Sequence, residues 1–241
     1  MARNVVITGA GTGIGAAVAG RFVADGERVF LTGRRRAPLE SVAQRLGSLA
    51  SWETCDVTEP AQIERWRQTL PERVDVLVNN AGGNTDFDRP PPSDLAELSA
   101  GWLSNLRANL LSAVLVTEAL RGRLAPGGAV VSLGSIAADK GAGSYGAAKA
   151  AIASWNVDLA RELGPRGVTA NVVSPGYTQS TEYFRDRLTD QRRTRLIQDA
   201  ATGRAGTPDD VAGAIHFLAS GAARQITAQV LAVNGGAFPT R

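Results

Sequence analysis

NVVITGAGTGIGAAVAGRFVA, residues 4–24, combines three consecutive patterns that decide the fold. The apolar run at residues 4–8 predicts a buried strand. Gly9 to Gly15 predicts a glycine-rich turn, and residues 16–24 predict a helix. A strand, a glycine-rich turn and a helix in this order begin a dinucleotide-binding fold, because the glycines admit a pyrophosphate and the helix N-terminus offers it free N–H groups.

The rest of the chain continues to alternate between strands and helices. Apolar runs predict strands at residues 28–32, 50–55, 74–78, 129–133, 168–173 and 229–233. Helical patterns lie at residues 39–46, 60–70, 103–124, 144–163 and 209–218, and the polar residues 177–204 predict a flap. We find no internal repeat or linker, so residues 1–241 are predicted to form a single α/β domain, with a parallel sheet between two helical layers.

Composition excludes several classes of protein. No run approaches the roughly 18 apolar residues of a membrane helix, and the N-terminus lacks a signal-peptide core, so we expect a cytoplasmic protein that does not bind membranes. The net charge is only +3 and basic residues are scattered, which argues against nucleic-acid binding. With one cysteine and one histidine, a disulfide or a metal site is not expected. We interpret Cys55 as a packed core thiol and His216 as structural.

A candidate catalytic group comes from the segment between residues 135 and 149. Tyr145 and Lys149 are four residues apart in an Ala-rich run, so on a helix they share one face. A nearby ammonium favours the phenolate and lowers the pKa of a tyrosine from about 10, which suits a general acid or base. Ser135 follows the predicted strand 129–133 and is expected at its carboxyl end, where open α/β sheets bind ligands.

The end of the second predicted strand bears on cofactor choice. A site for NAD places Asp or Glu there, to bind the ribose 2′-hydroxyl. This chain has Gly33 instead, followed by Arg34, Arg35 and Arg36. Because a guanidinium suits a 2′-phosphate, we predict a preference for NADPH, with one or two of the three arginines solvated and Arg34, the closest to the strand, favoured as the phosphate ligand.

Together these motifs resemble the short-chain dehydrogenase/reductase family in its compact branch, over nearly the whole chain. The motifs are Thr8-Gly9-x-x-x-Gly13-x-Gly15, Asp56-Val57, Asn79-Asn80-Ala81-Gly82, Ser135, Tyr145-x-x-x-Lys149, Pro175-Gly176 and Asn234-Gly235-Gly236. The resemblance implies a Rossmann fold, a doubly wound parallel sheet of seven strands in the order 3-2-1-4-5-6-7. It also implies an oxidoreductase that acts on a ketone or secondary alcohol with NADPH/NADP+, and less readily with NADH/NAD+.

The resemblance assigns roles to individual residues. It implies that Tyr145 is the general acid/base, that Lys149 activates it and holds the nicotinamide ribose, and that Ser135 binds the substrate carbonyl. Asn109 is implied to support a water-mediated proton relay to Lys149. Together, the patterns and the resemblance predict these cofactor-binding residues: Gly9, Gly11, Thr12, Gly13, Ile14, Gly15, Gly33, Arg34, Asp56, Val57, Asn80, Ala81, Gly82, Tyr145, Lys149, Pro175, Gly176, Thr178 and Ser180.

Some alternatives stay open. Many relatives have a longer gap between serine and tyrosine, and Ser132 sits at that longer spacing, although Ser135 fits the strand-end context better. The hydroxyl that contacts the nicotinamide carboxamide could belong to Thr178, Ser180 or Thr181. A catalytically silent sensor of NAD(P) on the same fold is the alternative function; it is disfavoured because both Tyr145 and Lys149 are present. Enoyl reductases of the family usually have a wider Tyr-to-Lys spacing.

The resemblance also implies an assembly. In the family the helices that correspond to residues 103–124 and 144–163 pair across a two-fold axis, and the C-terminal strand and helix often form a second interface. Two such contacts close a homotetramer, and one of them alone gives a homodimer. The expected partner is a small carbonyl or alcohol substrate. The segments 83–92, 136–144 and 177–203 are expected to line its pocket, but they carry no recognisable code for its identity.

Overall fold

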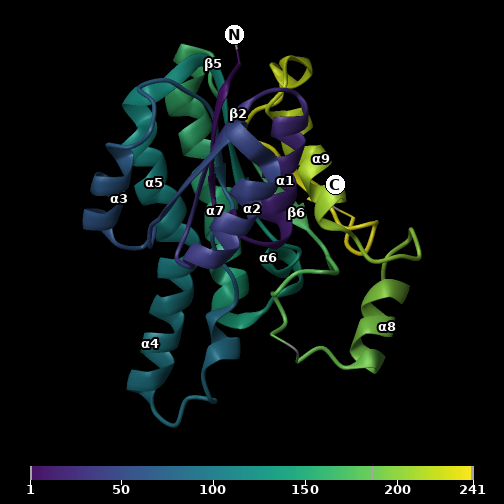
Figure 1. The fold of residues 1–241 in the computed structure, drawn as a ribbon. Coiled ribbons are helices and arrows are strands. Elements are labelled where there is room, and N and C mark those ends of the chain that lie inside the picture. Colours follow the sequence, from purple (N-terminus) through teal and green to yellow (C-terminus); the bar gives the residue numbers. More distant parts are fainter. Residues whose placement is uncertain (1, 186, 240–241) are drawn as a thin grey trace.

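The computed structural model describes residues 2–185 and 187–239, and a seven-stranded parallel sheet with helices on both faces forms its centre (Figure 1). The strand order is β3-β2-β1-β4-β5-β6-β7, as the family resemblance predicted. The strands are β1 (Asn4–Thr8), β2 (Arg28–Gly33), β3 (Ala50–Thr54), β4 (Val74–Asn79), β5 (Leu124–Leu133), β6 (Thr169–Pro175) and β7 (Val230–Val233).

Alternate side chains of the central strands pack on opposite helical layers. In β1, Val5 and Ile7 belong to a buried cluster with Phe22, whereas Val6 belongs to a second cluster with Trp66. Successive side chains of a strand point to opposite faces of the sheet. Both faces of β1 are therefore apolar and buried, which explains why the parallel strands appear in the sequence as continuous apolar runs.

The helices form one layer on each face of the sheet (Figure 1). The first layer contains α1 (Gly13–Ala24), α2 (Arg36–Leu46) and α9 (Pro208–Leu218). The second contains α3 (Pro60–Arg67), α5 (Ser112–Leu120) and α7 (Gly143–Leu163). The remaining helices, α4 (Leu95–Leu106), α6 (Ala137–Lys140) and α8 (Asp190–Gln198), lie in the connections that follow the carboxyl ends of the strands.

The helix predicted at residues 103–124 has different bounds and an interruption. It begins at Leu95, because Asp94 caps α4 by accepting a 2.8 Å hydrogen bond from the backbone N–H of Glu97. A π-helical turn, Arg107–Leu111, separates α4 from α5. The prediction was also wrong at the other end, since α5 ends at Leu120 and Leu124 already pairs with Val74 in the sheet.

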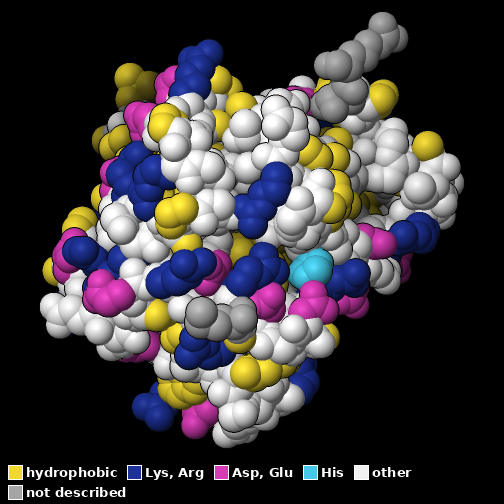
Figure 2. Space-filling model, turned by 90° about the horizontal axis from the view of Figure 1, so that it is seen from above, with side chains coloured by type: hydrophobic (Ala, Val, Ile, Leu, Met, Phe, Trp, Pro, Cys, Tyr) yellow, Lys and Arg dark blue, Asp and Glu magenta, His cyan; other side chains and the backbone are white. Residues whose placement is uncertain are grey.

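Three observations concern the helix lengths, the surface charges and His216. Within the described residues, no helix has the length and apolar character that crossing a bilayer requires. On the face shown in Figure 2, the Lys and Arg side chains lie scattered among acidic and apolar ones. The His216 imidazole lies 2.7 Å from the Asp25 carboxylate and its ring packs on Phe22 at a centroid distance of 5.1 Å, contacts that suit a structural residue.

Candidate active site

The glycine-rich turn after β1 forms a close-packed cradle at the start of α1. Gly9 and Gly13 have φ angles of +64° and +53°, in the left-handed region that favours glycine. A Cβ atom on Gly15 would lie 2.4 Å from the carbonyl oxygen of Gly9, so a larger residue does not fit there. The first turn of α1 carries no acidic residue, and its N–H groups have no partner within the helix. The turn therefore suits an anionic group such as a pyrophosphate.

Asn80 locks this turn to the end of β4. Its Nδ2 donates 2.9 Å hydrogen bonds to the carbonyl oxygens of Thr8 and Gly9. The Thr8 hydroxyl accepts from the backbone N–H groups of Asn80 and Ala81, each at 3.0 Å. The carboxyl ends of two adjacent strands are thus held together, and Gly82 follows directly. The predicted residues of β1 and β4 lie side by side, as a shared cofactor site requires.

The three arginines after β2 have different environments. Arg36 stacks over the Trp52 ring at 5.2 Å and lies 3.6 Å from the Glu40 carboxylate. Arg35 instead binds the carboxylate of Glu182, and Arg34 is exposed. Arg36 is therefore directed toward β3, which leaves Arg34 and Arg35 as the candidates for a cofactor phosphate.

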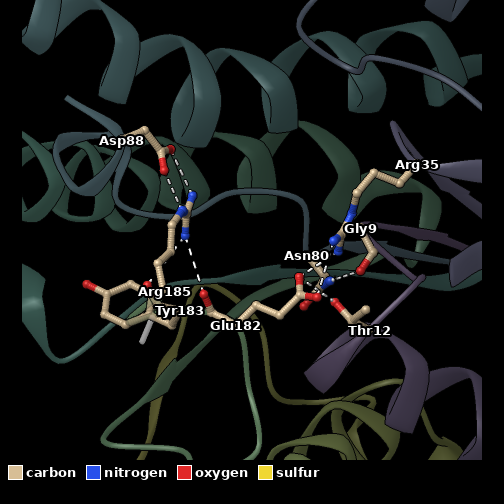
Figure 3. A network of polar contacts seen from close by, with 8 residues as sticks. All are labelled: Gly9, Thr12, Arg35, Asn80, Asp88, Glu182, Tyr183 and Arg185. Carbon is tan, nitrogen blue, oxygen red and sulfur yellow. Dashed lines mark hydrogen bonds and ion pairs between the residues drawn. The ribbon is translucent and has the colours of Figure 1, made fainter. Parts of the chain in front are cut away.

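The Glu182 carboxylate tests whether this region accepts negative charge (Figure 3). Arg35 donates hydrogen bonds of 3.2 and 2.5 Å to its two oxygens, and the Thr12 hydroxyl lies 3.4 Å from it. The Arg35 guanidinium holds the pKa of Glu182 below its usual range. Side chains of the turn and of the segment after β2 thus gather around a carboxylate. This donor set fits the phosphates of a dinucleotide.

Tyr145, Lys149 and Ser135 come together at the carboxyl end of β5. Tyr145 and Lys149 lie on one face of α7, and both are buried. The Lys149 Nζ lies 5.9 Å from the centroid of the Tyr145 ring and donates a 2.7 Å hydrogen bond to the carbonyl oxygen of Leu133, the last residue of β5. Ser135 follows two residues later, and its hydroxyl lies close enough to the Tyr145 phenol to lower the pKa of that group. The predicted catalytic group is therefore assembled in space.

Burial dominates the protonation of both titratable groups. It lowers the pKa of Lys149 to about 7, because the charged ammonium is removed from water. Burial raises the pKa of Tyr145, and hydrogen bonds with Ser135 and Tyr183 offset part of that increase. The expectation that Lys149 lowers the pKa of Tyr145 is therefore contradicted: at neutral pH the buried phenol keeps its proton.

The structure separates the two candidate serines. Ser132 is buried within β5, and its hydroxyl lies 3.4 Å from the Nδ2 of Asn79. Asn79 in turn donates a 2.9 Å hydrogen bond to the Thr117 hydroxyl of α5. Ser132 thus contributes to the packing between the sheet and a helix. Ser135 is the serine beside Tyr145.

Asn109 lies in the π-helical turn and is buried. Its Nδ2 donates 3.0 Å hydrogen bonds to the carbonyl oxygens of Gly83 and Asn105, and its Oδ1 accepts from the Gly83 N–H at 3.0 Å. A Cβ on Gly82 would lie 2.6 Å from Asn109 Oδ1 and 3.5 Å from Lys149 Nζ. Asn109 and Lys149 therefore reach the same point of the chain. The irregular turn is typical of a functional site.

Comparisons with known proteins agree with this geometry. A family model described as enoyl-(acyl carrier protein) reductase matches residues 9–237. The 3-oxoacyl-[acyl-carrier-protein] reductase FabG of Escherichia coli is 33% identical over 241 residues, which cover 97% of this chain and 96% of the relative. A short-chain dehydrogenase/reductase from Brucella melitensis superposes with a TM-score of 0.89 at 31% identity, over 99% of this chain and 97% of the other.

A third match is the structure of a blue fluorescent protein from a metagenomic library in complex with NADPH. It has a TM-score of 0.85 and is 29% identical over 98% of each chain. The chain belongs to the short-chain dehydrogenase/reductase family. It is an NAD(P)-dependent oxidoreductase that acts on carbonyl and alcohol groups.

In the segment after β6, the three hydroxyl groups that are candidates for the nicotinamide carboxamide have different environments. The Thr178 hydroxyl turns back to the carbonyl oxygen of Gly176 at 3.3 Å, and Ser180 is exposed with a φ of +57°. The methyl group of Thr181 lies 3.4 Å from the position that a Cβ would take on Gly13. Of the three, Thr181 is the residue packed on the glycine-rich turn.

Asp56 and Val57, two further predicted cofactor-binding residues, lie just beyond the end of β3. The Asp56 carboxylate accepts hydrogen bonds of 3.0 and 2.8 Å from the N–H and hydroxyl of Thr58, at the end of β3. Val57 is buried in the apolar core behind it. Cys55 is buried as well, and burial raises the pKa of its thiol to about 11, which agrees with a packed core thiol.

Sequence reasoning missed the residues that the flap segment, residues 177–204, brings to this dehydrogenase/reductase site. Glu182 reaches Arg35, and the Tyr183 ring lies 5.6 Å from that of Tyr145. Both lie in a polar segment without a motif, and their contacts are with residues far away along the chain. No local signal in the sequence could have identified them.

Proposed function

We propose that this enzyme reduces a ketone to a secondary alcohol and prefers NADPH. The observation that carries the proposal is the group of Ser135 with the buried Tyr145 and Lys149 at the carboxyl end of β5. It is supported by the FabG relative, whose name describes the reduction of a 3-oxoacyl group, and by the NADPH complex among the similar structures.

The protein's own residues position the substrate and transfer the proton. When bound, the nicotinamide supplies the hydride that adds to the carbonyl carbon. Tyr145 donates its phenolic proton to the carbonyl oxygen, and its raised pKa keeps that proton in place at neutral pH until negative charge develops on the oxygen. Ser135 orients the oxygen and stabilises its charge. Lys149, with a pKa of about 7, returns a proton toward Tyr145.

Asn109 supports the return of that proton. Its amide holds the backbone of Gly83, and the preceding residue, Gly82, lies beside Lys149, so the lysine and this segment after β4 keep a fixed separation. We infer that a water-mediated relay runs from Lys149 past Asn109 to solvent. The hydrogen bond from Lys149 to Leu133 fixes the other end of the relay.

The matching family model suggests a second reaction, because its description names an enoyl substrate. The Tyr-x-x-x-Lys spacing of this chain favours carbonyl reduction, since enoyl reductases of the family usually have a wider spacing. A catalytically silent sensor remains the other alternative, and the retention of Tyr145 and Lys149 argues against it.

Cofactor preference rests on the residues at the end of β2. Gly33 stands where an NAD-binding relative carries an acidic residue. Arg34 was predicted to bind the 2′-phosphate, and we add Arg35, which already holds a carboxylate in the structure. Two guanidinium groups at this strand end favour NADPH over NADH.

We further propose that the enzyme is a homotetramer. Large apolar side chains of α4 are exposed, with Leu95 at 81% and Leu103 at 62%, beside Leu98 and Trp102. A second exposed group, Phe217, Val230 and Leu231, lies on α9 and β7. With two separate apolar faces, each subunit can pack against two other copies of the chain. Two such interfaces close a tetramer. A cytoplasmic location stays a prediction from the sequence.

One experiment tests the proposed reaction. Purified enzyme is assayed with a panel of ketones and alcohols, with NADPH and NADH. Tyr145→Phe keeps the ring and removes the transferable proton, so turnover should fall at least ~100-fold. NADPH binding, followed by fluorescence titration, should be retained. A Tyr145→Phe enzyme that reduces the same ketone at nearly the wild-type rate refutes the mechanism.

A further inference from the structure

A chain of aromatic side chains extends from the Tyr145 ring. The Tyr183 ring lies 5.6 Å from the Tyr145 ring, 5.6 Å from Phe87 and 4.8 Å from Phe184. Phe184 in turn lies 5.9 Å from Tyr177. These centroid distances are those of favourable aromatic pairs. All three tyrosines of the chain lie in this group although aromatic residues make up only 5% of it, so the clustering does not follow from composition.

Two ion pairs hold the flap segment over the site, one before and one after Tyr183 along the chain (Figure 3). On one side, the Glu182 carboxylate binds Arg35. On the other, the Arg185 guanidinium binds both oxygens of Asp88 at 2.5 and 2.9 Å and contacts the carbonyl oxygen of Tyr183 at 3.4 Å. The Tyr183 ring is thus held against Tyr145 from both ends.

Phe87 is fixed from below by a separate hydrogen-bond network. The Asp86 carboxylate accepts a 2.9 Å hydrogen bond from Asn105 of α4 and a 3.1 Å hydrogen bond from Ser144 of α7. Asn105 also accepts from the N–H of Thr85 at 3.0 Å. The short helix Thr85–Asp88, which carries Phe87, is therefore tied to both helices and forms a firm wall.

The position of Tyr183 indicates where a substrate would lie relative to Tyr145. Its hydroxyl lies near the Tyr145 hydroxyl and the Asn84 side chain, which both act on its pKa, and its planar ring packs edge to face against Phe87 and Phe184. A substrate oxygen that receives the proton of Tyr145 must lie beside this hydroxyl, within hydrogen-bond reach of the Tyr145 phenol. A planar ring attached beside that oxygen would then meet the same aromatic faces.

We propose that the aromatic wall, Phe87, Tyr177, Tyr183 and Phe184, selects ketones that carry an aromatic ring next to the carbonyl over saturated ketones of equal size, and that Tyr183 is the selecting residue. This proposal rests on the proposed ketone reduction. Aromatic contacts distinguish the two substrate classes because a saturated ring buries a similar area but lacks the charge distribution that favours edge-to-face packing.

Acetophenone and cyclohexyl methyl ketone test the proposal as a matched pair. With NADPH, we expect the wild-type enzyme to show a kcat/KM roughly tenfold higher for acetophenone, the ratio given by one or two aromatic contacts of ordinary strength. Tyr183→Leu should abolish this preference, whereas Tyr183→Phe, which keeps the ring, should retain it. Phe30→Leu, which removes an aromatic side chain of β2 that packs on the second core cluster, is the control and should also retain it.

A binding measurement keeps this result separate from the proposed reaction. Calorimetric titration of both ketones into the enzyme with NADP+ gives their Kd values without turnover. Tighter binding of acetophenone that depends on Tyr183, with neither ketone reduced, supports the wall and refutes the ketone reduction. Tyr145-dependent reduction of both ketones with equal kcat/KM and equal Kd overturns the wall and leaves the reaction standing. A preference that survives Tyr183→Leu overturns the role of Tyr183.

Discussion

The guanidinium of Arg35 donates a hydrogen bond to the carboxylate of Glu182, 147 residues away in the sequence, with an Nη2–Oε2 distance of 2.5 Å. Both side chains are 59% exposed, so the pair adds little to stability. The pair matters because of its position: Arg35 follows β2, whose end we propose to bind the adenosine end of the cofactor, and Glu182 precedes Tyr183. A phosphate that reaches Arg35 competes with Glu182 for the same guanidinium.

Removal of the arginine charge should change cofactor choice. Arg35→Ala is expected to weaken the binding of NADPH about ten- to 100-fold, because a charge-assisted hydrogen bond contributes about 1.5–3 kcal/mol. The affinity for NADH, which lacks the 2′-phosphate, should change little. Arg34→Ala measures the share of the exposed neighbour, and Arg36→Ala is the control, since Arg36 stacks on Trp52. Equal losses of NADPH and NADH affinity in titrations would contradict the assignment.

Removal of the competing carboxylate should have the opposite effect. Glu182→Gln frees Arg35 from an exposed ion pair, so NADPH should bind about two- to fivefold more tightly, which corresponds to the usual strength of such pairs. NADH affinity should stay nearly constant. Glu64→Gln breaks a comparable surface pair with Arg67 on α3 and serves as the control. Unchanged or weaker NADPH binding by Glu182→Gln would show that the carboxylate does not compete.

Burial of Lys149 should appear in the pH dependence of stability. Its pKa is about 7 in the folded protein and 10.5 when solvated, so between these values unfolding takes up a proton. The wild-type free energy of unfolding should therefore rise with pH across this window, by at most about 1.4 kcal/mol per pH unit from this group, and the contribution should be lost as pH falls toward 7.

Variants of the two lysines of the chain isolate that contribution. Lys149→Met should lack this part of the slope, whereas Lys140→Met, on the more exposed lysine, should keep it. Urea unfolding at pH 7, 8 and 9 measures both. Identical slopes for the wild type and Lys149→Met would mean that the Lys149 ammonium stays charged inside the fold.

Assembly should depend on the exposed apolar side chains. Leu103→Glu places a charge on the α4 face and Val230→Glu places one on the β7 face, at side chains that are 62% and 39% exposed. Each variant should reduce the tetramer to a dimer, and the double variant should give a mass near 25.1 kDa in size-exclusion chromatography with light scattering. A wild-type mass near that of one subunit would refute the tetramer.

The sequence predicted those parts of the fold and site that depend on neighbours along the chain. Buried parallel strands appear as apolar runs, and Gly9 to Gly15 could be recognised because a tight turn restricts the residues that fit. The opposite pKa direction of Tyr145 could not be foreseen, because it depends on how much protein surrounds the phenol. The approach of Tyr183 and Glu182 depends on the tertiary path of a segment without periodicity.

The π-helical turn at Arg107–Leu111 limits how this protein can be engineered. A π turn amounts to one residue more than a regular helix needs, and deleting one residue would restore an ordinary α-helix with better local geometry. Every side chain beyond the deletion would then rotate by about 100° around the axis. Redesign for thermostability that idealises this helix would thus turn Asn109 away from Gly83. The helix would become more regular, but the proposed contribution of Asn109 to the active site would be lost.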